Sequence, residues 1–240
     1  VISLNLAGIE SNPGFHLNAD LLLRAAVGAE FGDIFMRCVY RMRPYEATPG
    51  SVDALHKEWL AKVQKFVSAK HISIPKFRRM CTEIIRDFDA IPVLDIQKPN
   101  SASIICPRVG VVGEILVKFS PAGNNHLVEL LESEGAEAVV PDLLDFMLYC
   151  FYNQIYKAEH LGTSKKTAKI SALGIWAIEH ILRGSAVKAF EESKHFDAPT
   201  SIYKIVSYAE PIVSIGNQTG EGWFLTGEML ELIKSGVNNI

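Results

Sequence analysis

The sequence predicts an α/β protein with a Rossmann-like parallel sheet that has helices on both faces and is preceded by a mostly helical segment. An apolar strand, an amphipathic helix and a second apolar strand follow one another over residues 108–140, which is the order of a βαβ unit. A further strand-like run, PIVSI at 211–215, leads into a glycine-rich loop and a helix. Before residue 108, apolar residues recur instead at helical spacing.

The amino-terminal segment begins with a short alternating strand, ISLNLAG, and continues with helices. The first helix starts at Asn18, a suitable N-cap, and stops at Pro44, because proline lacks the N–H that a helix interior needs. Two more helices fit residues 51–69 and 75–88, since their apolar side chains fall on one face.

A linker is expected between the two parts of the chain. Residues 95–107 have two prolines around a polar centre, which is typical of a domain boundary. We therefore divide the chain into a short strand plus a mostly helical segment at 1–107, and a Rossmann-like α/β domain at 108–240.

The carboxyl-terminal part alternates between strands and helices. Apolar strands fit 109–112 and 138–140, and an amphipathic helix fits 124–134 between them. This unit predicts parallel strands joined by a right-handed crossover. Further elements are then expected in chain order: helices at 142–161, 164–182 and 185–194, the strand at 211–215, and a helix that ends at Gly236.

The last residues, GVNNI, have the apolar character of another strand about to begin, at Val237 and Ile240. The α/β domain is therefore expected to be truncated before its last strand. On this interpretation the chain is a piece of a longer polypeptide.

Composition argues against several classes of partner. The formal net charge of −3, from 24 basic and 27 acidic residues, gives no electrostatic basis for binding nucleic acid or an anionic membrane. No run approaches the roughly 18 apolar residues of a membrane span. The four cysteines form no C-x-x-C pair and no metal-ligand spacing. We expect a cytoplasmic protein with no metal site of its own.

The stretch VVGEILVKFSPAGNN is the first candidate ligand loop, because ligands gather where parallel strands end and helices begin. It lacks the glycine fingerprints of phosphate-binding loops, which also disfavours a free-standing dinucleotide enzyme. One interpretation makes Gly113 a corner and Asn124 or Asn125 an N-cap. The other places Gly113, Glu114 and Asn125 at a cleft.

A second candidate loop, GNQTGEGWF, follows the strand expected at 211–215. It is longer than the two to six residues that such a connection usually needs, and it is rich in glycine and polar side chains. Asn217 and Glu221 are its cleft candidates. The alternative is a turn-rich surface loop with Trp223 folded back on the core.

Arginines gather at the end of the first predicted helix, in RMRPYE. Arg41 and Arg43 suit a helix carboxyl terminus through the helix dipole alone. Alternatively, they clamp a carboxylate or a neighbouring domain. No catalytic triad or carboxylate pair is indicated by spacing elsewhere, so the catalytic residues are not predicted.

Four segments resemble a known family: VISLNLAGIESNPGF, FGDIFMRCVYRMRPYEATPGS, VGVVGEILVKFSPAGNNHLVELLESEGAEAVVPDLLDFMLYCFYN and GEGWFLTGEMLELIKSGVNNI. They are similar to the dehydratase-like region of the large activators of 2-hydroxyacyl-CoA dehydratases, the CoA activases of anaerobic bacteria. The resemblance covers most of the chain and is weakest at 65–105 and 160–205.

The resemblance implies a domain of an ATP-dependent, iron–sulfur, low-potential electron-transfer protein. The partners that it implies are ATPase modules and a cysteine-bearing cluster domain of the same polypeptide, together with 2-hydroxyacyl-CoA dehydratase or a similar acceptor. ATP and the cluster would belong to the full-length protein, with no cofactor and no catalysis expected in this fragment alone. The alternative is a noncatalytic docking module that couples an ATPase to its redox partner.

Overall fold

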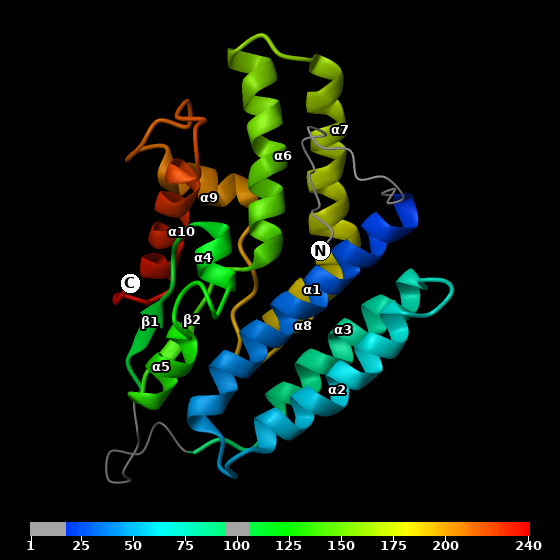
Figure 1. The fold of residues 1–240 in the computed structure, drawn as a ribbon, viewed down its shortest axis with the longest axis vertical. Coiled ribbons are helices and arrows are strands. Elements are labelled where there is room, and N and C mark those ends of the chain that lie inside the picture. Colours follow the sequence, from blue (N-terminus) through cyan, green and yellow to red (C-terminus); the bar gives the residue numbers. More distant parts are fainter. Residues whose placement is uncertain (1–17, 95–105) are drawn as a thin grey trace.

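The computed structural model describes residues 18–94 and 106–240 (Figure 1). The strand expected in ISLNLAG and most of the expected linker lie outside these residues. The amino-terminal part consists of α1 (Ala19–Met42), the short 3₁₀ turn η1 (Arg43–Tyr45), α2 (Ser51–Val67) and α3 (Ile74–Asp89). The three long helices pack against one another, as the helical spacing of the sequence predicts.

Local sequence explains the ends of these helices. The Asn18 side chain accepts a hydrogen bond from the backbone N–H of Leu21, which caps α1. Ser73 caps α3 in the same way, with Pro75 in the first turn where no N–H is needed. The face of α3 predicted to be apolar is buried in the structure.

The strands β1 (Arg108–Gly110) and β2 (Glu137–Val139) form a two-stranded parallel sheet, and Arg108 lies opposite Glu137 in the register. The crossover between them contains α4 (Ile115–Phe119) and α5 (Leu127–Ser133). Val109 of β1 also forms an isolated parallel bridge with Asn239, near the end of the chain. The predicted parallel pairing of the two strands is therefore confirmed.

The predicted Rossmann-like sheet with helices on both faces is wrong. The described residues are mainly helical, and their only named sheet is the pair β1–β2. The run 211–215 is a turn and not a strand, and it follows a helix that the sequence interpretation missed, α9 (Ile202–Ala209). Apolar β-branched residues suggested a strand there. However, Pro211 has no backbone N–H to donate to a neighbouring strand, and Ile215 is buried as part of the turn.

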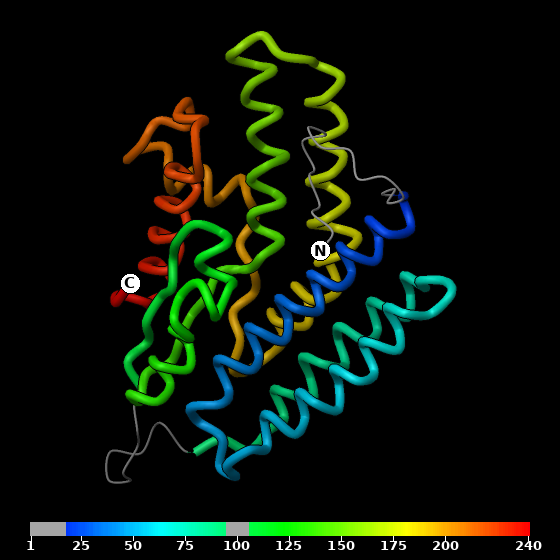
Figure 2. Tube along the Cα trace, in the orientation of Figure 1, coloured from blue at the N-terminus to red at the C-terminus, as the bar shows by residue number. Residues whose placement is uncertain are grey.

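The remaining helices are α6 (Leu143–His160), α7 (Lys165–Trp176), α8 (Gly184–Glu191) and α10 (Gly222–Lys234), with the π-helical segment η2 (Ala177–Leu182) joining α7 to α8. The helices α6 and α7 form an antiparallel hairpin that extends beyond the rest of the molecule (Figure 2). In η2 the backbone N–H of Arg183 donates to the carbonyl of Ile178, five residues earlier. This wider turn sets the position of Arg183 at the start of α8.

One buried apolar cluster extends from Val27 on α1 to Phe224 on α10. The elements on the two sides of residue 107 also pack directly, with α1 against α6 and β2, and α3 against α8. The division at residue 107 stays a prediction, and the two parts share a core. No helix among the described residues is long and apolar enough to cross a membrane.

Gly227 lies where α10 packs tightly against Ile205 of α9. A Cβ built there would lie 2.6 Å from Cγ2 and 2.9 Å from the carbonyl oxygen of Ile205. Gly227→Ala should therefore lower the free energy of unfolding by about 1–3 kcal/mol, measured by urea denaturation. Gly28→Ala is the matched control, because a Cβ at that α1 position meets nothing within 4 Å. It should be neutral or stabilise by up to about 1 kcal/mol, and equal stability of the two variants would contradict the close packing.

Candidate functional site: an arginine-lined cleft

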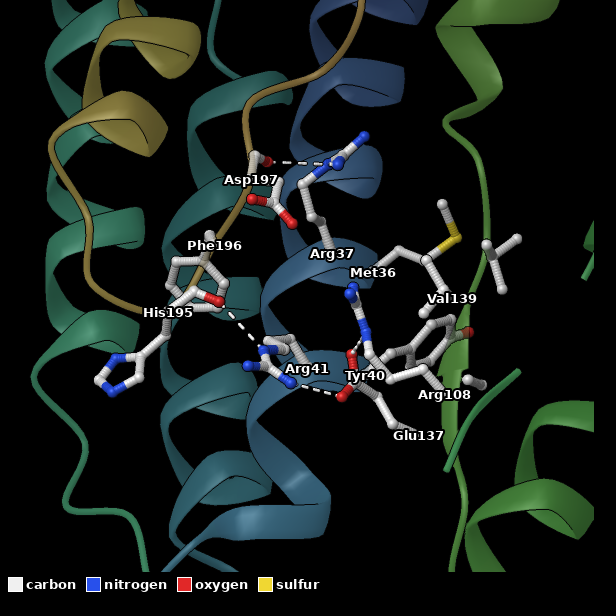
Figure 3. Close-up of a pocket in the computed structure, with 12 residues that line it drawn as sticks. Met36, Arg37, Tyr40, Arg41, Arg108, Glu137, Val139, His195, Phe196 and Asp197 are labelled. Carbon is white, nitrogen blue, oxygen red and sulfur yellow. Dashed lines mark hydrogen bonds and ion pairs between the residues drawn. The ribbon is translucent and has the colours of Figure 1, made fainter. Parts of the chain in front are cut away.

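Three neighbouring cavities, of about 50, 300 and 420 Å³, lie between α1, the sheet and residues 193–200. Arg108 and Asp197 line all three, so the cavities form one cleft. We call it the arginine cleft, after Arg37, Arg41 and Arg108, and we call residues 193–200 the strap. Figure 3 shows the smallest cavity, with arginines from α1 and the sheet pointing into it.

The strap has no regular secondary structure, and α1 and α3 hold its backbone. Arg37 and Arg41 are one helical turn apart on α1 and so lie on the same face. Arg37 Nη1 donates to the carbonyl of Asp197 at 3.3 Å, and Arg41 Nε donates to the carbonyl of His195 at 3.0 Å. The Asp89 carboxylate at the end of α3 accepts from the backbone N–H of His195 at 3.1 Å. The path of the strap is therefore set by side chains of other elements.

Glu137 is a buried carboxylate of the smallest cavity, with a side chain that is only 1% exposed. Arg41 Nη1 pairs with its Oε2, and Arg108 Nε donates to its Oε1 at 2.9 Å. The Tyr45 hydroxyl donates to Oε2 at 2.8 Å. Burial and this hydrogen bond both raise the pKa of Tyr45, so the hydroxyl stays a donor. Two guanidinium groups around one carboxylate leave this part of the cleft positively charged.

The cleft runs over one face of the sheet. Glu137 and Val139 are alternate residues of β2 and therefore point to the same face, and Arg108 is the register partner of Glu137. All three line the cleft. The larger cavity of about 300 Å³ continues past Val140 and Pro141, where β2 has ended, towards α9 and α10. The carboxyl end of a strand is a usual place for a ligand in parallel sheets.

A second group of charges adjoins the cleft around the buried Arg183, and one of its members, Asp145, lines the cavity of about 300 Å³. The guanidinium nitrogens of Arg183 lie 2.5 Å from Asp145, 3.3 Å from Asp142, 3.7 Å from Glu30 and 3.8 Å from Asp33. The Asp33 carboxylate also accepts from the backbone N–H groups of Leu143 and Leu144, which caps α6. Arg37 joins this group to the cleft through a 2.8 Å contact with Asp142.

Carboxylates outnumber arginines in this group, and burial raises the pKa of Glu30 to about 7 and that of Asp33 well above its usual value. Between the usual glutamate pKa of 4.5 and pH 7, the folded protein therefore binds more protons than the unfolded chain, and stability should fall as the pH rises.

Glu30→Gln removes one of the groups that make the stability of the protein fall as the pH rises. Between pH 5 and pH 7, the free energy of unfolding of the variant should change by about 2 kcal/mol less than that of wild type, measured by urea denaturation at each pH. Glu58→Gln, at an exposed position on α2, should leave the pH dependence unchanged. If the free energy of unfolding depends on pH in the same way in wild type and Glu30→Gln, Glu30 does not bind a proton in the folded state over this pH range.

The structure places the first candidate loop beside the sheet but outside the cleft. Gly113 has no positive φ and open space around its Cβ position, so this corner does not require glycine. Glu114 caps α4, because its Oε2 accepts from the backbone N–H groups of Leu116 and Val117. Asn125 is exposed with a φ of 56°, and the neighbouring Asn124 makes the capping contact to Leu127.

The second candidate loop meets the first. Burial raises the pKa of Glu221, the charge of Glu114 adds to this effect, and a hydrogen bond from the backbone of Ile115 opposes it. Asn217 is exposed. The structure thus brings Glu114 and Glu221 together and leaves Asn125 and Asn217 at the surface. None of the predicted loop residues lines the arginine cleft, and their role in ligand binding stays a prediction.

The cysteines do not gather. Cys38, Cys81 and Cys106 are buried, Cys150 is partly buried in α6, and all are free. Burial raises the pKa of Cys150 to about 11, so its thiol stays protonated near neutral pH. Within residues 18–94 and 106–240, no three His, Cys, Asp or Glu side chains are arranged to hold a metal ion.

The sequence interpretation identified Arg41 but missed Arg37, Arg108 and Glu137. One signal was available: Glu137 is a charged residue inside the apolar run AEAVV, and such a residue needs a buried partner. Its partners were not readable, because Arg41 is 96 residues away in the chain. Comparisons with protein-family models, with curated proteins and with solved structures found no match to this chain.

Proposed function

We propose that the chain is the dehydratase-subunit-like domain of an ATP-dependent, iron–sulfur, low-potential electron-transfer protein. In this proposal the complete protein activates 2-hydroxyacyl-CoA dehydratase or a related reductase and works in the cytoplasm. The support comes from the long sequence segments that resemble the large activators of these dehydratases.

One structural observation carries the proposal furthest. Within the described residues, the segments that bear the resemblance pack on one another through charged pairs whose carboxylates are buried, although they are far apart in sequence. These pairs are Arg41 with Glu137, Arg37 with Asp142, and Lys118 with Glu228. The resemblance therefore covers one contiguous structural unit, as expected of a domain shared with relatives.

The residues that the structure describes do not fit an iron–sulfur cluster. Such clusters are held by cysteine thiolates, whereas three of the four cysteines here are buried apart and burial keeps Cys150 protonated. We therefore assign the cluster and the ATPase modules to other parts of the complete polypeptide. This domain would supply a wall to which those parts and the electron acceptor bind.

Anaerobic reconstitution with iron and sulfide tests the proposal. The complete polypeptide should become brown and should activate a 2-hydroxyacyl-CoA dehydratase when ATP and a reductant are added. The 240-residue chain alone should stay colourless. If the complete polypeptide takes up no iron, the redox function is wrong, and the noncatalytic docking module becomes the better explanation.

The loop carboxylates can be tested in the complete protein. Glu114→Gln and Glu221→Gln should lower ATP-dependent reduction if these loops face the cluster or the acceptor. Glu159→Gln, at an exposed position near the end of α6, is the matched control. Wild-type rates in both loop variants would remove the loops from the site.

A further inference from the structure

The cavity of about 300 Å³ beyond β2, which we call the β2 compartment, has the features of a ligand site. Residues from α1, the sheet, the strap, α9 and α10 line it, so distant parts of the chain converge there. Its volume is at the lower end of the range for ligand pockets, which suits a small metabolite. Its apolar wall includes Val140, Pro141 and Leu232.

Two lysines at the compartment have no ion-pair partner among the described residues. Lys204 on α9 and Lys234 on α10 instead lie over the ring of Tyr208, with Nζ at 5.9 and 4.9 Å from the ring centre. Both lysines and Tyr208 line the compartment, and both lysines are exposed at its edge. Two ammonium groups at one ring repel each other, and an anion bound between them would relieve this repulsion.

Arg37 adds a further positive charge to the compartment. Its Nη atoms contact Asp142 and the strap carbonyl of Asp197, but its buried Nε has no hydrogen-bond partner within the described ranges. The other arginine of the compartment, Arg108, is already paired with Glu137. Protein atoms cover the Nε of Arg37, so a ligand in the compartment would interact with the positive charge of the Arg37 guanidinium group and would not reach the Nε hydrogen.

Glu231 on α10 lines the compartment, and its protonation changes the negative charge there with pH. Burial and the nearby Asp145 raise its pKa to about 7, while a hydrogen bond from Thr200 and the charge of Arg37 oppose that rise. The charged groups that face it come from every neighbouring element: Arg37, Arg108, Asp142, Asp145, Asp197, Lys204, Lys234. At pH 6 Glu231 is mostly neutral, so the two lysines face less negative charge than at pH 8.

We propose that the β2 compartment binds a small organic anion through a carboxylate or phosphate group, held by Lys204 and Lys234 and attracted by the positive charge of Arg37. The cations favour negative charge, the apolar wall favours a carbon skeleton, and the volume favours a compact molecule. This site does not depend on the redox function proposed above. Its presence or absence leaves the iron reconstitution experiment unaffected.

Isothermal titration of the 240-residue chain with inorganic phosphate, with succinate and with sulfate tests the site. At least one anion should bind saturably, and the stronger of phosphate and succinate identifies the preferred group. Lys204→Gln combined with Lys234→Gln should weaken binding about tenfold or more. Lys169→Gln, at an exposed position on α7, should not change it. Absence of saturable binding, or an equal loss in Lys169→Gln, would overturn the proposal.

The pH dependence of anion affinity tests the effect of Glu231 on the compartment. Sulfate keeps a constant charge from pH 6 to pH 8, so any change in its affinity reports on the protein. Wild type should bind sulfate several-fold more tightly at pH 6 than at pH 8, and Glu231→Gln should lose most of this difference, with only the smaller effect of Asp145 and Glu228 left. A pH dependence of the affinity in Glu231→Gln as large as in wild type would place the main titrating group elsewhere and overturn this arrangement of the site.

Discussion

Replacing Arg183 with methionine should lower the free energy of unfolding by about 3–5 kcal/mol, the largest effect expected of any single substitution at a charged residue. The side chain is only 3% exposed and lies within 4 Å of four carboxylates. Its removal leaves these carboxylates buried without their main cation. For a chain of this length the melting temperature should fall by about 10 °C, measured by circular dichroism at pH 8.

The loss should shrink at lower pH. Without Arg183 the pKa values of the carboxyl groups rise further, and the folded state of the variant binds protons that the unfolded chain has already released. Arg183→Met should therefore recover part of its stability between pH 8 and pH 5. Arg86→Met is the control, because Arg86 and its partner Glu192 are 67% and 52% exposed and their pair should contribute less than about 1 kcal/mol. Similar losses in both variants would contradict a central role for Arg183.

Glu228→Gln should be comparably damaging, with a loss of about 3 kcal/mol or more. Glu228 Oε1 lies 2.7 Å from Lys118 Nζ, and the two side chains are 0% and 2% exposed. The pair joins α4 to α10, and the charge of Lys118 and its hydrogen bond oppose the rise in the pKa of Glu228 that burial causes. The substitution leaves a buried ammonium group without a carboxylate.

Removing both charges distinguishes the pair from two independent sites. Lys118→Met combined with Glu228→Met replaces the pair with apolar side chains of similar length, so neither charge stays buried alone. The double variant should be more stable than either Lys118→Met or Glu228→Met, as measured by urea denaturation. If its loss equals the sum of the single losses, the two residues do not act as a pair.

The helices were the most predictable part of the fold. In α3, apolar residues recur at three- and four-residue spacing between a serine cap and a charged outer face, so local pattern and tertiary packing agree. The helix α9 has the same spacing at Ile202, Ile205, Val206 and Ala209, but its β-branched residues and its eight-residue length weakened the signal. The short strands were predicted as parts of a larger sheet. An apolar run indicates that a segment can form a strand, but it does not tell how many other strands pair with it.

The cleft was less predictable, since its contacts join residues that are far apart in the chain. The spacing of Arg37 and Arg41 places both on one face of a helix, yet their partners are strap carbonyls 160 and 154 residues later. A backbone carbonyl has no sequence signature. Likewise, the convergence of Lys204 and Lys234 depends on how α9 packs against α10, which Gly227 permits by its lack of a side chain.

The anchoring of the strap bears on how this protein can evolve. Arg37 and Arg41 bind main-chain carbonyls, which every amino acid provides, and Asp89 binds main-chain N–H groups. Substitutions at strap positions such as Asp197 or Thr200 therefore alter the lining of the cleft while the loop keeps its path. A lineage could change what the cleft accepts by single mutations in the strap, without first finding compensating changes in the scaffold.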